Sequence, residues 1–244
     1  MIRSGNPALT ADSFTVPMLQ DEAMTLQGTV NKTALALAIT TAAAFYVWNR
    51  SFAGAPVQGF MLLGAIGGLV VALITIFKKT AAPWTPPAYA ALEGLFLGGL
   101  SATFELRFPG IVLQAVFLTF GTLFALLAAY KSRLISVTQN FRLGIAAATG
   151  GILLVYLLSM ILGFFGMRVP LIHESGPVGI LFSLFVVGVA ALNLVLDFDF
   201  IEQGAARGAP KYMEWYGAFG LIVTLIWLYI EILHLLAKLQ SRRR

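Results

Sequence analysis

The sequence of 244 residues contains no cysteine, and charged residues make up only 11% of it. The lack of cysteine excludes disulfides, thiolate nucleophiles and cysteine-based metal sites. A soluble domain carries about 25% charged and about 45–50% apolar residues. This chain is instead 59% hydrophobic and has a mean hydropathy of +0.86. The scarcity of charge therefore indicates that a lipid bilayer surrounds most of the chain.

The apolar residues lie in runs of about 20 residues, the length that an α-helix needs to cross about 30 Å of hydrocarbon. A β-barrel would show segments of about 10 residues that alternate apolar and polar positions, and the sequence has none. We therefore expect an all-α polytopic membrane protein, a bundle of seven transmembrane helices in one domain at residues 33–240. The expected spans are residues 33–48, 57–77, 88–104, 111–130, 143–165, 178–201 and 215–238. Residues 1–32 form a flexible polar tail and residues 241–244 a basic tail.

Glycines recur inside the expected spans, notably Gly64, Gly67 and Gly68 in the second span and Gly94 and Gly98 in the third. Membrane helices use such small residues to approach each other closely. We expect these glycines to mark packing faces between helices and not a ligand site.

The net charge is +5, and most Lys and Arg residues lie near the ends of the expected spans. This placement follows the positive-inside rule and suits anionic lipid headgroups, so it predicts the bilayer, and not nucleic acid, as the partner. The loops on the N-terminal side carry more basic residues than the opposite loops, which favours a cytoplasmic N-terminus. Lys238 and Arg242–Arg244 then face the other side, against the same rule.

Four acidic residues lie within or close to the apolar runs: Glu93, Asp197, Asp199 and Glu231. A carboxylate at bilayer depth costs about 2.5–3.5 kcal/mol on insertion scales, so it is rare and usually functional. Asp197 and Asp199 differ by about 200° around a helix, so one of them at most faces the bundle interior. Asn193 lies one turn before Asp197 on the same face, which makes Asp197 the inward candidate. We expect Asp199 to face headgroups or water.

Glu231 lies well inside the last apolar run, and His234 and Lys238 share its helix face. Two carboxyls that share a buried site titrate as a coupled pair. The alternative is that each acid is interfacial and is satisfied by water or a basic neighbour. Glu93, a few residues after Pro87, suits an interfacial and a functional role equally.

The sequence lacks the complete motifs of intramembrane enzymes. Gly99-Leu-Ser101 superficially matches the Gly-x-Ser of intramembrane serine proteases, with His234 as a base, but no third group is placed to orient that base. The Gly-x-Gly-Asp pattern of di-aspartyl intramembrane proteases is absent. The two histidines lie in separate segments, and a metal site needs clustered ligands. We expect no enzyme activity, no cofactor and no bound metal.

Two motifs give the chain a resemblance to a known family. Asp197 followed by Ile201, and the run Leu228-Tyr-Ile-Glu231, resemble the motifs of the Bax-inhibitor-motif family, which includes the YccA-like bacterial proteins. The polar start around Ser4–Pro7 and the Glu93-Gly94 pair are similar to a bacterial branch. The resemblance implies a seven-helix fold with the C-terminal helix at its centre, in the plasma or inner membrane of a bacterium.

In that family the two acids form a pH-sensing pair linked to a slow calcium leak, so the resemblance implies that Asp197 and Glu231 form the pair here. The second acid is Glu instead of Asp, and the expected second span carries no basic residue that could latch the pair. The alternative is a non-conducting regulator that binds another membrane protein, such as a membrane protease complex, as the YccA-like members suggest. Calcium would then not be a transported ion.

The depth of the two acids in the bilayer adds one structural expectation. If the last helix began at Lys211, Glu231 would lie about 30 Å from the Gly204 turn, whereas Asp197 lies about 10 Å from it. The two carboxyls meet only if Lys211–Gly217 lies along the membrane surface. Its composition, rich in aromatic and charged residues, is typical of an interfacial segment. We therefore expect a short amphipathic element at Lys211–Gly217.

Overall fold

The computed structural model describes residues 23–166 and 176–243, and this part of the chain is built from α-helices. The connection around Arg168 and the first 22 residues lie outside the described residues. The elements are α1 (Leu26–Phe52), α2 (Gln58–Phe77), the 3-10 helix η3 (Lys79–Ala81), α3 (Thr85–Arg107), α4 (Ile111–Lys131), α5 (Gln139–Phe164), α6 (Pro177–Ala206) and α7 (Met213–Arg243).

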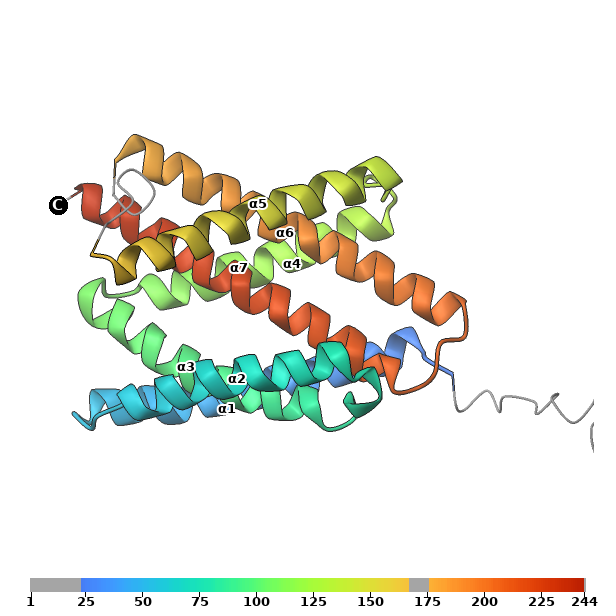
Figure 1. Cartoon of the computed structure of the whole chain (residues 1–244), viewed down its shortest axis with the longest axis horizontal. Helices are drawn as coiled ribbons and strands as arrows, with labels where there is room; N and C mark the ends of the chain where they lie inside the picture. Colours follow the sequence, from blue (N-terminus) through green and yellow to red (C-terminus); the bar gives the residue numbers. More distant parts are fainter. Residues whose placement is uncertain (1–22, 167–175, 244) are drawn as a thin grey trace, which may run out of the picture.

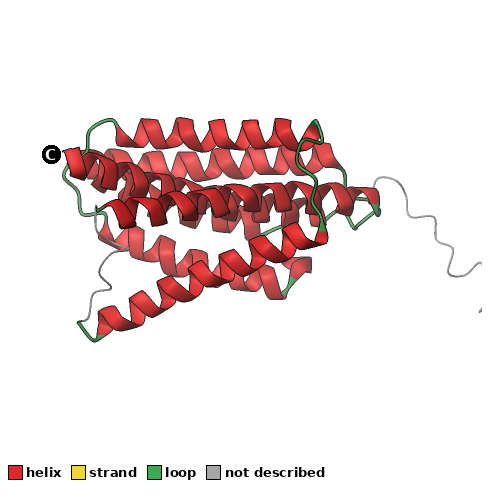
Figure 2. Cartoon of the chain, turned by 90° about the horizontal axis from the view of Figure 1, so that it is seen from above, coloured by secondary structure: helices red, strands yellow, loops and turns green. Residues whose placement is uncertain are grey.

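The helices run along one long axis and form a bundle (Figure 1). α1 and α2 both pack against α3, and α4, α5 and α6 lie together above these three helices in this view. α7 crosses the bundle diagonally and contacts α1, α3, α4 and α6. The view from above shows that the connections gather at the two ends of the bundle (Figure 2). Successive helices therefore cross the same layer in opposite directions.

Six helices of the described part are long and apolar enough to cross a membrane: α1, α2, α4, α5, α6 and α7. α3 is less apolar because its sequence includes Thr, Pro, Tyr, Glu and Gly residues. The outward faces of the bundle are apolar, as on α2, where Leu62, Ile66 and Val70 are exposed. A soluble bundle would present polar residues on such faces. The chain is therefore a multi-pass membrane protein.

The glycines predicted to mark packing faces lie where helices approach most closely. A Cβ at Gly64 of α2 would stand 2.5 Å from the carbonyl oxygen of Leu92 and 2.7 Å from the backbone nitrogen of Phe96, both on α3. A Cβ at Gly94 of α3 would stand 2.7 Å from the Cβ of Ala43 on α1. The expectation of glycine packing faces is confirmed at these positions.

Several helices begin earlier or end later than the predicted spans. α1 begins at Leu26 and not at residue 33, because the Thr25 hydroxyl caps it by accepting from Gly28 N at 2.9 Å. α3 begins at Thr85, with a proline in its first turn. α7 continues through the predicted basic tail to Arg243. The polar ends thus extend the helices beyond the apolar runs that defined the predicted spans.

The predicted amphipathic element at Lys211–Gly217 is wrong, because α7 starts at Met213 and continues unbroken to Arg243. Its first turn is held inside the protein. Glu214 is buried, forms an ion pair with Lys32 of α1, and accepts from the Thr25 backbone N–H at 2.9 Å. Gly217 packs so closely against α6 that a Cβ there would stand 3.0 Å from Ile201 Cγ1. These contacts hold the start of α7 against α1 and α6.

A matched pair of glycine substitutions tests the α2–α3 packing. Gly64→Ala should lower the free energy of unfolding by about 1–3 kcal/mol, because the new methyl group meets backbone atoms of α3 that cannot move cheaply. Gly121→Ala on α4 meets no atom within 4 Å and should leave stability unchanged or raise it by up to about 1 kcal/mol. Thermal unfolding in detergent micelles measures both, and equal losses would contradict this packing account.

Candidate functional site

Glu231 is the carboxyl that the bundle encloses most completely among the four sequence candidates, with 3% of the residue exposed. It lies on α7 and accepts a hydrogen bond from the Tyr156 hydroxyl of α5 at 2.8 Å. It also accepts one from Trp227 Nε1 at 3.2 Å, from one turn earlier on its own helix. A buried carboxylate needs such donors, because burying a carboxylate without hydrogen-bond partners would strongly destabilise the folded protein.

Two basic side chains follow Glu231 on the same face of α7. Lys238 lies seven residues further on, attracts the Glu231 carboxylate electrostatically, and donates to the Gly179 carbonyl at 3.1 Å and the Ser183 hydroxyl at 2.8 Å on α6. His234 is exposed, and its ring packs edge-on against Phe104 of α3 at 5.6 Å between centroids. Glu231, His234 and Lys238 thus form a row of polar side chains that extends toward the C-terminal end of α7.

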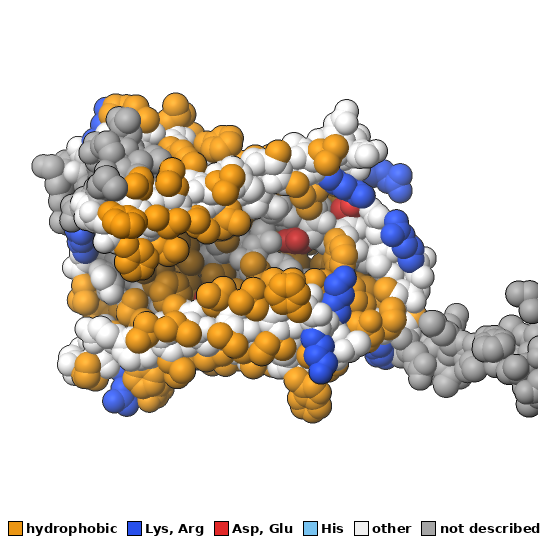
Figure 3. All heavy atoms as spheres, in the orientation of Figure 1, with side chains coloured by type: hydrophobic (Ala, Val, Ile, Leu, Met, Phe, Trp, Pro, Cys, Tyr) orange, Lys and Arg blue, Asp and Glu red, His pale blue; other side chains and the backbone are white. Residues whose placement is uncertain are grey.

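These groups line a cavity of about 800 Å³ between α5, α6 and α7. Its polar lining comprises Thr149, Tyr156, Ser159, Glu231, His234 and Lys238, and Leu, Ile, Met, Phe and Trp side chains form the rest. The Ser159 hydroxyl is buried and has no hydrogen-bond partner within the described residues. The face of the molecule shown in Figure 3 has a hollow between α5 and α2. Hydrophobic side chains border this hollow on both sides, and an acidic side chain is visible inside it. A polar cavity inside apolar helices is typical of a site for ions or protons.

Asp197 lies on α6 and faces a different stretch of α7. The Thr224 side chain hydrogen-bonds to its carboxyl, and Asp197 Oδ1 lies 3.7 Å from where a Gly220 Cβ would stand. Its second oxygen, Oδ2, is buried and has no hydrogen-bond partner within residues 23–166 and 176–243. Asp197 therefore faces the bundle interior, as the sequence predicts, and retains a free acceptor there.

The structure does not bring Asp197 and Glu231 together. Glu231 lies seven residues beyond Thr224, which corresponds to about 10 Å along the axis of α7. The predicted meeting of the two carboxyls depended on a surface segment at Lys211–Gly217, but α7 already begins within this segment, at Met213. The two acids are nevertheless related, because both face one side of α7.

That side of α7 is a polar stripe, defined here as Thr224, Trp227, Glu231, His234 and Lys238. The spacings alternate between three and four residues, which places all five side chains on one face of the helix. Asp197 meets the stripe at one end through Thr224, and Lys238 marks the other end. The stripe connects the two acids without direct contact between them.

The remaining sequence candidates serve helix packing. Asp199 accepts from Arg142 Nη2 of α5 at 2.6 Å and from Gln203 at 2.8 Å, so Arg142 is its basic neighbour. Asn193 donates to the Thr149 hydroxyl of α5 at 2.9 Å. Glu93 accepts from Tyr89, one turn earlier on α3, and lies against Gly68 of α2.

Sequence reasoning missed three residues that build the site: Tyr156, Trp227 and Thr224. Trp227 and Thr224 carried a signal, since they lie four and seven residues before Glu231 on the same helix face. Tyr156 carried none, because the packing of α5 against α7 follows from tertiary structure alone. Within the described residues no group of three His, Asp or Glu side chains could hold a metal ion.

Comparison with known proteins gives one match. The family model described as Bax inhibitor 1 like matches residues 6–241, nearly the whole chain. No curated protein and no solved structure gives a match. The matched region includes both acids and the complete polar stripe.

A conservative change at Tyr156 tests the environment of Glu231. Tyr156→Phe should lower the free energy of unfolding by about 1–3 kcal/mol, because a buried carboxyl loses one of its donors. Tyr46→Phe removes a hydroxyl that accepts from Arg50 on the exposed face of α1, and should change stability by no more than about 0.5 kcal/mol. Thermal unfolding of both variants in lipid nanodiscs measures these changes. An equal shift in unfolding temperature would show that the Tyr156 hydrogen bond contributes no more than the exposed Tyr46 bond.

Proposed function

The chain belongs to the Bax inhibitor 1 like family, and we propose that it forms a pH-sensitive leak pathway for cations, with calcium as the transported ion. The observation that carries the proposal is the buried carboxyl of Glu231 in a cavity of about 800 Å³ inside apolar helices. An ionisable group in such a place is costly and usually marks an ion or proton path.

We further propose that all seven helices cross the bilayer and that α7 is the central one. α3 is 23 residues long, which is enough to span the hydrocarbon, and it lies along α1 and α2. In α7, 56% of the apolar window is buried in the protein, whereas the other candidate spans reach at most 39%. A helix that contacts α1, α3, α4 and α6, as well as α5 through Tyr156, and is mostly buried in the protein suits the wall of a pathway.

In this proposal Asp197 and Glu231 are two successive sites along the polar stripe of α7, and they are not a contact pair. At about 10 Å the two carboxylates are too far apart to share a proton or to bind one ion together. Each carboxylate can attract a cation on its own. Asp197 has a free acceptor oxygen, and Glu231 lies in the cavity with its two hydrogen-bond donors.

The pH dependence follows from the charge of these sites. At high pH the carboxyls are ionised and attract a cation into the stripe, and at low pH protonation removes that attraction. The groups that face Glu231 are Tyr156 on α5 and Trp227, His234 and Lys238 on α7. Lys238 is the nearby amine that attracts the Glu231 carboxylate, and an incoming cation competes with it for the carboxylate. We therefore expect flux to rise with pH.

The orientation follows from the distribution of basic side chains. Lys and Arg gather over the end that carries the α2–α3, α4–α5 and α6–α7 connections (Figure 3). The positive-inside rule places this end in the cytoplasm, with the chain in a plasma or inner membrane. Asp197 is then nearer the cytoplasmic side and Glu231 nearer the opposite side.

Glu231→Gln should flatten the pH dependence of flux, because the amide keeps the size of the side chain but cannot change its charge. The test is calcium flux into proteoliposomes that contain the full chain and a calcium-sensitive dye, measured over a pH series. Glu202→Gln, at an exposed carboxyl bonded to Tyr130, is the matched control and should keep the pH curve of the unmodified protein. A Glu231→Gln variant with an unchanged curve rules out Glu231 as the pH-sensing group. Absence of flux in the unmodified protein would favour a non-conducting regulator of another membrane protein.

Asp197→Asn and Asp199→Asn should differ in their effect on flux. Asp197 faces the polar stripe, so losing its charge should reduce flux strongly. Asp199 forms a partly exposed ion pair with Arg142, and such pairs contribute at most about 1 kcal/mol to stability. Its replacement should leave flux nearly unchanged. The two variants are compared in the same proteoliposome assay. Equal effects on flux would show that Asp197 is not part of the proposed pathway.

A further inference from the structure

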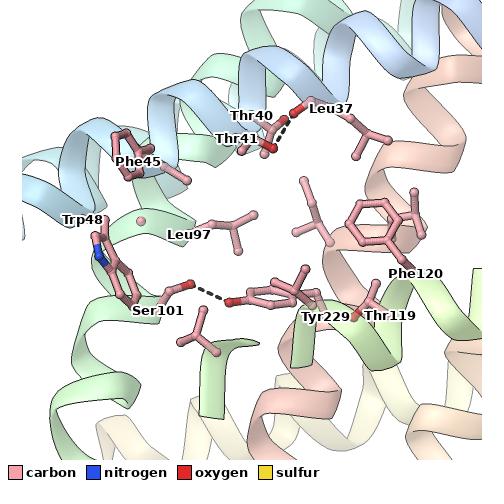
Figure 4. Close-up of a pocket in the computed structure, with 16 residues that line it drawn as sticks. Leu37, Thr40, Thr41, Phe45, Trp48, Leu97, Ser101, Thr119, Phe120 and Tyr229 are labelled. Carbon is pink, nitrogen blue, oxygen red and sulfur yellow. Dashed lines mark hydrogen bonds between the residues drawn. The ribbon is translucent and has the colours of Figure 1, made fainter. Parts of the chain in front are cut away.

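A second cavity lies on the other side of α7, between α1, α3, α4 and α7, and has a volume of about 400 Å³ (Figure 4). α7 contributes Leu225, Ile226 and Tyr229 to it, whereas Trp227 and Glu231 face the polar cavity. One helix therefore separates an apolar cavity from a polar one. The volume falls in the range of cavities that hold a small organic molecule, about 300–1,000 Å³.

The wall of this cavity offers almost nothing to a polar ligand. Three of its threonines, Thr40, Thr41 and Thr119, each donate to the backbone carbonyl four residues earlier on their own helix, at 2.8–3.0 Å. The hydroxyls of Ser101 and Tyr229 bond to each other at 2.7 Å, as the dashed line in Figure 4 shows. All but one of these five hydroxyl hydrogens are thus already donated within the protein. The remaining lining is aliphatic and aromatic, which favours a hydrocarbon.

The cavity lies beside an exposed apolar surface of α1. α1 and α4 lie on opposite walls of it, and these two helices do not pack closely against each other. Phe45 lines the cavity, and 64% of this residue is exposed on the membrane-facing surface of α1. A hydrocarbon chain can therefore enter sideways from the bilayer without crossing a polar phase.

One end of the cavity is placed for a lipid headgroup. Trp48 lines it in the last turns of α1, and Trp side chains prefer the membrane–water interface. The exposed Arg50 follows two residues later, with its guanidinium over the rings of Tyr46 and Phe60. Its guanidinium lies toward α2, which does not line the cavity, so Arg50 marks the depth of the lipid headgroups and is not part of the cavity.

We propose that the apolar cavity between α1, α3, α4 and α7 binds an acyl chain of a bilayer phospholipid. The occupant is a single lipid chain that enters between α1 and α4, with its headgroup at the level of Arg50. The site does not depend on conduction by the chain, so it can be tested whether or not the protein conducts ions.

The test uses the full chain in phosphatidylcholine vesicles that contain some phosphatidylcholine with a photo-activatable diazirine on one acyl chain. After irradiation, mass spectrometry of the digested protein locates the adducts. The expected result is a concentration of adducts on cavity residues of α1 and α4, such as Phe45, Val116 and Phe120. Adducts spread evenly over the outward faces of α2 and α5 would overturn the proposal, and so would cross-links between two protein copies at the cavity.

Filling the cavity gives an independent test. Val116→Phe places a ring in the cavity from α4 and should abolish the concentrated adducts, whereas Val70→Phe on the exposed face of α2 should keep them. Thr41→Phe fills the cavity from the α1 side and serves if Val116→Phe does not fold. Equal labelling of the folded filling variant and Val70→Phe would show that the label lies elsewhere.

Discussion

The hydrocarbon around these helices forms no hydrogen bonds, so polar groups within the bundle need partners inside the protein. The threonines meet this constraint locally, as Thr40 does by donating to the Ala36 carbonyl of its own helix. Charged groups need partners from other helices, and Tyr156 of α5 supplies one to Glu231. The described atoms that break the rule, Ser159 Oγ and Asp197 Oδ2, lie beside the cavity or on the proposed pathway. The buried polar atoms without a hydrogen-bond partner in the described part of the chain therefore lie where we propose that an ion or proton passes.

α7 separates two cavities of opposite character because its two faces have different compositions. The polar stripe from Thr224 to Lys238 faces α5 and α6, whereas Leu225, Ile226 and Tyr229 face α1, α3 and α4. Tyr229 and Glu231 are two residues apart and point to opposite sides. A small rotation of α7 would change both cavities together.

The sequence was sufficient to predict those features that depend on local interactions along one helix or on the surrounding bilayer. Apolar runs located the helices, glycines located close packing, and the 200° between Asp197 and Asp199 separated an inward acid from one paired with Arg142. The sequence did not predict the position of one helix relative to another along the bundle axis. Spacing along a chain does not fix that register, so the meeting of Asp197 with Glu231 and the separate segment at Lys211–Gly217 were both predicted incorrectly.

The register between α6 and α7 is fixed by contacts at both ends of their interface. At one end Gly217 lets α7 pack against Ile201, and at the other Lys238 donates to Gly179 and Ser183. To bring Asp197 to the level of Glu231, α6 would have to slide along α7 by about two turns, roughly 10 Å. Such a slide would break the Lys238 bonds and separate Gly217 from Ile201. A sliding mechanism would need protonation to supply the free energy lost with both sets of contacts. We therefore place the proposed pH sensing in the charge of each carboxyl at its own position, without a large sliding of the helices.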